Sequence, residues 1–113
     1  MISGSVYIDG RRYDIKFCLS SYGNGCIISC NGYDIEYSCS VEVRDDIIDL
    51  YCFVMGVFRC AIGYGRSNGN RKRCIEWCMN VFGDDCISDK SRYDRIIMAL
   101  GSEIEKKRNG CLI

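Results

Sequence analysis

Apolar and polar residues alternate along residues 1–43, which is the pattern of strands with one buried and one exposed face. Asp9-Gly10 and Asn31-Gly32 interrupt this alternation, and both pairs are favoured in two-residue hairpin turns. The segment 20–25, "SSYGNG", supplies a third turn between the two hairpins. The sequence therefore predicts four antiparallel strands that follow one another as a meander.

The hairpin turns also predict which side chains share a face of the sheet. Ile8 should lie opposite Arg11, and Cys30 opposite Tyr33. The predicted apolar face comprises Val6, Ile8, Tyr13, Ile15, Phe17, Leu19, Cys26, Ile28, Cys30, Tyr33, Ile35, Tyr37, Cys39, Val41 and Val43. The opposite face carries Asp14, Lys16, Asp34, Glu36, Ser38, Ser40 and Glu42. We expect the first face to be buried and the second to face water.

Residues 46–62 are apolar nearly all round, which fits a helix buried across the sheet. Asp45 and Asp46 can cap its start, and Arg59 lies near its end, as the helix dipole favours. The alternative is a hairpin that turns at Met55-Gly56, because Tyr, Cys, Phe and Val favour strands. The sequence favours the helix.

Two more segments have helical periodicity. Residues 70–82 place Cys74, Trp77, Cys78 and Val81 on one face and end at Gly83. Residues 88–110 place Tyr93, Ile96, Ile97, Leu100 and Ile104 at helical spacing, with a basic end and a stop at Asn109-Gly110. The predicted fold class is therefore α+β: a four-stranded antiparallel β-meander with two tight hairpins, followed by about three α-helices packed on one face. We expect one domain over 1–113, with the meander in 1–43 and the helical half in 44–113.

Composition narrows the functional classes. The chain has 113 residues and a net charge of zero, so its overall charge gives no indication of nucleic acid or an anionic membrane as a partner. Arg59 interrupts the longest apolar run, and the N-terminus has no secretory signal pattern. The ten cysteines lie within apolar patterns, where free cysteine packs as a small hydrophobic residue. We therefore expect a reduced, cytoplasmic protein without a membrane partner.

The chemistry available to the chain is limited by the absence of histidine, which excludes the usual Ser-His-Asp and Cys-His hydrolases and imidazole metal sites. Asp84 and Asp85 are adjacent carboxylates, and a turn explains them better than acid–base catalysis. The sequence predicts no catalytic residues and no cofactor, and an enzyme has no support from it.

Two Cys-x-x-x-Cys spacings raise the question of zinc. Cys26 and Cys30 would lie about 13 Å apart along a strand, too far for one tetrahedral ion. Cys74 and Cys78 lie one helical turn apart, but neither pair occupies the tight turn typical of zinc motifs. No metal site is predicted. Cys74 and Cys78 are instead candidate reactive thiols, because Cys74 would follow the basic run 71–73 in a first helical turn; packing beside Trp77 is the alternative.

The stretch 61–73, "AIGYGRSNGNRKR", combines glycines with basic residues directly before a helix. Its glycine spacing matches neither a dinucleotide-binding turn nor a P-loop. Free backbone N–H groups, a helix N-terminus and nearby charge nevertheless favour anions. The candidate anion- or nucleic-acid-binding residues are Tyr64, Arg66, Asn68, Arg71, Lys72 and Arg73. The alternative is a solvated loop between two helices.

Three functional hypotheses follow from the sequence. The first is a non-enzymatic protein-binding module of the inhibitor, adaptor or immunity type, of a size that suits a viral or mobile-element product. Such a module could form a homodimer through a free sheet edge or the cysteine-rich helix. The second is a binder of nucleic acid or a phosphorylated small ligand through residues 63–73. The third and weakest is a thiol redox or zinc protein.

Overall fold

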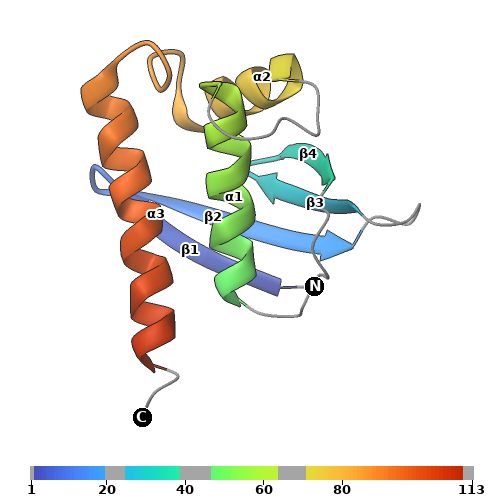
Figure 1. Ribbon diagram of the computed structural model, residues 1–113, viewed down its shortest axis with the longest axis vertical. Coiled ribbons are helices and arrows are strands. Elements are labelled where there is room, and N and C mark those ends of the chain that lie inside the picture. Colours follow the sequence, from blue (N-terminus) through green and yellow to red (C-terminus); the bar gives the residue numbers. More distant parts are fainter. Residues whose placement is uncertain (1, 20–24, 39–46, 64–70, 111–113) are drawn as a thin grey trace.

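The computed structural model describes residues 2–19, 25–38, 47–63 and 71–110 (Figure 1). Its strands are β1 (Ile2–Ile8), β2 (Arg11–Leu19), β3 (Gly25–Cys30) and β4 (Tyr33–Ser38). Its helices are α1 (Ile47–Ala61), α2 (Arg71–Phe82) and α3 (Lys90–Gly110). This order confirms the predicted α+β class. The expected caps Asp45 and Asp46 lie outside the described residues. So do residues 20–24 of the predicted middle turn 20–25, while Gly25 begins β3.

The four strands form one antiparallel sheet in the order β1-β2-β3-β4. Both hairpin turns have two consecutive residues with positive φ, as a type I′ turn requires: 53° and 79° at Asp9-Gly10, 53° and 83° at Asn31-Gly32. The register pairs Ile8 with Arg11 and Cys30 with Tyr33. Both predicted registers are therefore confirmed.

All three helices lie on the same face of the sheet (Figure 1). Helix α1 packs against both other helices and against β1, β2 and β3. Helix α2 lies beside β4, and α3 lies beside β1, so each edge strand has a helix next to it. The central position of α1 explains its apolar character on nearly every side. The alternative of a hairpin at Met55-Gly56 is wrong, because burial between layers outweighs the strand propensity of single residues.

The core lies between the sheet and the helices. On the strands its buried members are Val6, Ile8, Tyr13, Ile15, Phe17, Cys26, Ile28, Cys30 and Ile35, all on the predicted apolar face. Tyr33 is an exception because its side chain, at the end of the edge strand, remains 45% exposed. The side chains of Leu19 and Tyr37, and residues 39–43, lie outside the described part.

Glycines and one aspartate mark the helix ends. Gly63 has φ 88°, and its N–H donates to the Cys60 carbonyl at 3.1 Å. Gly83 has φ 107°, and its N–H donates to the Met79 carbonyl at 2.9 Å. Asp89 precedes α3, and its Oδ1 accepts the Ser91 N–H at 3.0 Å, as an N-cap does. Left-handed glycines thus end α1 and α2, as the sequence predicts for Gly83.

A close contact joins β1 to α1 at Gly4. A Cβ atom added at this position would lie 2.8 Å from Tyr51 Oη and 2.9 Å from Leu50 Cδ2. Tyr51 is almost fully buried, and its hydroxyl donates to the Ser5 carbonyl at 2.9 Å. The absence of a side chain at Gly4 therefore lets α1 approach the strand closely enough for this hydrogen bond.

Arg92, in the first turn of α3, connects three parts of the fold. Its guanidinium forms an ion pair with Asp9 in the β1–β2 turn. The same group donates to the Phe82 carbonyl at the end of α2 at 2.9 Å and to the Tyr13 hydroxyl at 3.5 Å. Only 14% of the Arg92 side chain is exposed. One cation thus links the sheet, α2 and α3.

Candidate functional site

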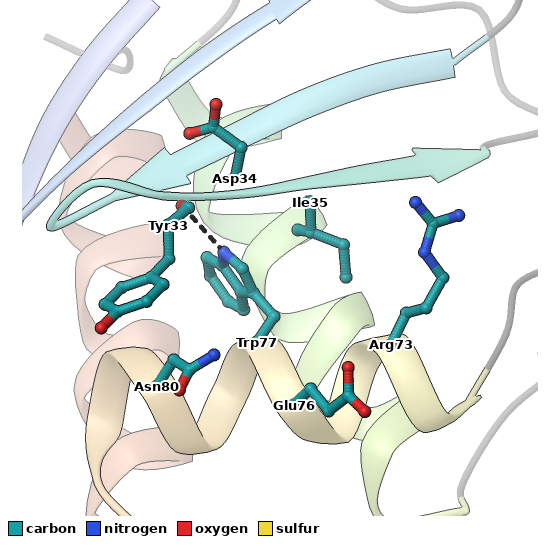
Figure 2. A pocket seen from close by; sticks show the side chains of 7 residues that line it. All are labelled: Tyr33, Asp34, Ile35, Arg73, Glu76, Trp77 and Asn80. Atoms are coloured by element: carbon teal, nitrogen blue, oxygen red, sulfur yellow. Dashed lines mark hydrogen bonds between the residues drawn. The ribbon is translucent and has the colours of Figure 1, made fainter.

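A groove runs between the edge strand β4 and helix α2 (Figure 2). Its volume is about 160 Å³, and it is open to solvent. The residues that line this β4–α2 groove are Tyr33, Asp34, Ile35, Arg73, Glu76, Trp77 and Asn80. They come from one short strand segment and one helix, so the packing of α2 beside β4 creates the groove.

Trp77 fixes the position of α2 against the strand. Its indole N–H donates to the Tyr33 carbonyl at 3.0 Å, as Figure 2 shows. The side chain is 3% exposed and packs edge-on to Phe82, with 6.1 Å between ring centroids. A buried indole needs such a partner for its N–H. Trp77 therefore serves as a structural wall of the groove.

The polar lining of the groove is spread along α2. Arg73, Glu76 and Asn80 occupy positions i, i+3 and i+7, which lie on one face of a helix. In Figure 2 Arg73 and Asn80 lie at opposite ends, with Trp77 between them. Within the described ranges, the side chains of Arg73 and Glu76 form no ion pair with each other or with another residue. These polar groups therefore do not converge on one point.

The predicted anion-binding residues do not form one cluster in the described structure. Tyr64, Arg66 and Asn68 lie outside the described residues. Arg71 Nε donates to the Ala61 carbonyl at 3.2 Å, so this side chain satisfies the C-terminal end of α1. Lys72 is exposed at the start of α2. Of the predicted set, only Arg73 lines the β4–α2 groove.

The two candidate thiols are buried. Cys74 is 2% exposed and Cys78 is fully buried, beside Trp77 in the core. Burial raises the pKa of Cys74, with a further contribution from a hydrogen bond to Cys60. Burial also raises the pKa of Cys78 above its ordinary value. This direction is opposite to the lowered pKa expected beside a basic helix start, because desolvation outweighs the charge of Arg73.

The buried thiols predict a loss of stability at alkaline pH. Burial raises the pKa of Cys30 and of Cys86 from 9.0 to about 11. The unfolded chain releases these protons from pH 9 upward, whereas the folded chain keeps them until about pH 11. The stabilisation is thus complete below pH 9 and is lost as the pH rises toward 11. We expect a decrease of about 1 kcal/mol per pH unit for each such thiol in the free energy of unfolding.

Urea denaturation followed by circular dichroism at pH 7, 9, 10 and 11, with a phosphine reductant present, would measure this effect. The variant Cys30→Ala removes one buried thiol and should flatten the dependence on pH. The variant Cys52→Ala, at an exposed position, should leave the slope unchanged. A free energy of unfolding that stays constant up to pH 11 would contradict the expectation.

A second hollow, of about 340 Å³, lies on the sheet face opposite the helices. Three of its polar side chains, those of Ser5, Arg12 and Asp14, already bond to one another. Asp14 Oδ1 accepts hydrogen bonds from Ser5 and Arg12, both at 2.7 Å. These two bonds, from Ser5 first and Arg12 second, lower the pKa of Asp14. Since Arg12 and Asp14 are already paired with each other, this face is a weaker site candidate than the β4–α2 groove.

Other candidate chemistry finds little support in the described residues. Asp84 and Asp85 lie in the turn after α2, as predicted, and Asp85 is 3.9 Å from Arg92. Within the described ranges, no cluster of three acidic or cysteine side chains could hold a metal ion. Nor does any helix of this part of the chain have the length and apolar character needed to cross a membrane.

Sequence reasoning missed most of the β4–α2 groove. The strand pattern places Tyr33 on the buried face, whereas its side chain is 45% exposed at the groove, and it gives Glu76 and Asn80 no role. Its placement of Asp34 on the water-facing side agrees with the structure. The polar i, i+3, i+7 spacing of Arg73, Glu76 and Asn80 was the one available signal, but such spacing also describes any solvated helix face. Which strand lies beside α2 could not be read from that spacing.

Comparisons of the chain with protein-family models, curated proteins and solved structures found no match. The function is therefore inferred from the residues and their geometry.

Proposed function

We propose that this protein is a small non-enzymatic binding module that recognises another polypeptide through the β4–α2 groove. The observation that supports it is the linear arrangement of Arg73, Glu76 and Asn80 along the groove. An active site for a small substrate needs reactive groups that converge on one atom. Groups spread along a helix beside a strand suit a chain that lies lengthwise.

The cytoplasm is the compartment in which we propose the module acts. Among the described residues the eight cysteines form no disulfide with one another, which agrees with a reducing environment. Recognition of nucleic acid or a phosphorylated ligand through 63–73 has less support, since Arg71 is engaged with the end of α1. Homodimer formation stays a prediction.

Affinity capture from the cells that express the protein, followed by titration calorimetry with the purified partner, tests the proposal. The variant Glu76→Lys changes the charge inside the groove. The matched control Glu105→Lys makes the same change on an exposed part of α3. We expect Glu76→Lys to weaken binding at least tenfold and Glu105→Lys to leave it unchanged. Equal affinities of the two variants would contradict binding through the groove.

A further inference from the structure

We infer that the β4–α2 groove selects an extended peptide segment with one acidic and one basic side chain two residues apart, in a fixed order. This inference rests on the proposed function and adds the chemistry of the partner. It follows from the spacing, charge and surroundings of Arg73, Glu76 and Asn80.

The spacing of these residues is short of that of an extended chain by an amount that their long side chains can span. Along a helix, Arg73 and Glu76 are separated by about 4.5 Å and Glu76 and Asn80 by about 6 Å. Alternate side chains of an extended peptide are about 6.7 Å apart and point to the same side. Since long side chains can spread at their ends, three alternate positions of a peptide can face Arg73, Glu76 and Asn80 in turn.

Two charged side chains of α2 define which peptide side chains would fit, because the carboxylate of Asp34 points away from the groove (Figure 2). Arg73 offers a planar guanidinium that can bind a carboxylate through two parallel N–H donors. Glu76 offers a carboxylate only one helical turn away, and neither group forms an ion pair within the described residues. An acidic side chain is therefore complementary to Arg73 and a basic one to Glu76. A peptide with two like charges would place one of them next to a groove residue of the same charge, which weakens binding.

The remaining lining supports a peptide over a small ion. Asn80 has an amide that can both donate to and accept from a peptide backbone. The ring of Tyr33, partly exposed, lies at the same end of the groove as Asn80 (Figure 2). Ile35 and Trp77 form an apolar surface between the two polar ends. Sites for extended peptides combine backbone hydrogen bonds with pockets for alternate side chains, and this lining offers groups for both.

Fluorescence of the full-length protein provides a direct test, because Trp77 is the only tryptophan of the chain and lines the groove. The probes are four acetylated and amidated pentapeptides: Thr-Glu-Thr-Lys-Thr, Thr-Lys-Thr-Glu-Thr, Thr-Glu-Thr-Glu-Thr and Thr-Lys-Thr-Lys-Thr. We expect one of the two mixed-charge peptides to bind at least fivefold more tightly than the other three. Chemical-shift changes in an amide NMR spectrum should be confined to β4 and α2.

A charge exchange identifies the residues responsible. The double variant Arg73→Glu/Glu76→Arg keeps the net charge and should reverse which mixed-charge peptide is preferred. The control Glu105→Arg/Arg108→Glu makes a similar exchange at the same spacing on α3 and should leave the preference unchanged. A stability measurement on both variants by urea denaturation shows whether each remains folded.

Several results would overturn the inference. One is the absence of a fluorescence response to any of the four peptides. Another is equal affinity for all four, and a third is a preference that the charge exchange does not reverse. A response to oligothymidylate in place of the peptides would also overturn it and would identify phosphate as the recognised group. If the inference fails while Glu76→Lys still weakens the captured partner, the proposed function stands without this charge order. If Glu76→Lys and Glu105→Lys behave alike in that experiment, the proposed function itself fails.

Discussion

The variant Gly4→Ala should lower the free energy of unfolding by about 2 kcal/mol, although it adds a single methyl group. The new Cβ atom would lie 2.8 Å from Tyr51 Oη and 2.9 Å from Leu50 Cδ2, well inside normal contact distances. Both neighbours are fully or almost fully buried, so neither can move without disturbing the α1–sheet packing. The lower chain entropy of alanine in the unfolded state offsets only part of this cost.

Urea denaturation of three variants separates this steric effect from others. Gly110→Ala is the matched control, because a Cβ atom there meets nothing within 4 Å, and its effect should stay below about 0.5 kcal/mol. Tyr51→Phe removes the hydroxyl that approaches Gly4 and its hydrogen bond to Ser5. Since the two changes share one contact, Gly4→Ala/Tyr51→Phe should cost less than the sum of the single variants. Strictly additive costs, or a Gly4→Ala variant as stable as the native protein, would refute this account.

The variant Arg92→Met should lower the free energy of unfolding by about 2–3 kcal/mol. Methionine keeps much of the apolar length of the side chain but removes every donor. The Phe82 carbonyl would lose a charged donor, and Asp9 would lose one of its two cationic partners. Because the Arg92 side chain is largely buried, water replaces these bonds poorly.

Arg95→Met is the natural control for this change. Arg95 also pairs with Asp9, at 3.2 Å, but its side chain is 52% exposed and no second partner is recorded for it among the described residues. An exposed ion pair of this kind contributes less than about 1 kcal/mol. Arg92→Lys should fall between the two, because an ammonium group cannot form the same forked set of bonds. If Arg92→Met and Arg95→Met lowered the free energy of unfolding equally, the buried position of Arg92 would add nothing to its contribution.

Local patterns in the sequence were sufficient for the elements of this fold. Asp9-Gly10 and Asn31-Gly32 determine turn type through positive φ, and a two-residue turn leaves one register. Alternation then assigns the faces of the strands. Helix α1 follows from its nearly continuous apolar character, and α2 and α3 follow from helical periodicity, with Gly83 marking the end of α2. Each of these signals lies within one element or one turn, so no knowledge of distant contacts is needed.

Contacts between distant residues could not be read in the same way. Arg92 and Asp9 are 83 positions apart, and nothing near either residue indicates the other. Arg71 belongs to a basic run that suggests anion binding, yet its hydrogen bond to Ala61 depends on how α1 and α2 meet. The groove likewise depends on α2 lying beside β4. A sequence pattern gives the elements in order, whereas their lateral neighbours follow from packing of the whole chain.

The order of elements also has a consequence for synthesis of the protein. The meander, in which nine of the described side chains are buried, precedes the three helices that cover it. A ribosome makes the chain from the N-terminus at about 5–20 residues per second. The apolar sheet face is therefore synthesised before α1 and stays partly exposed to solvent until α3 is made. A product that stops after β4 would keep that face uncovered and join with other copies. Premature termination should therefore yield insoluble fragments, and only synthesis through α3 gives a chain that can bury its own core.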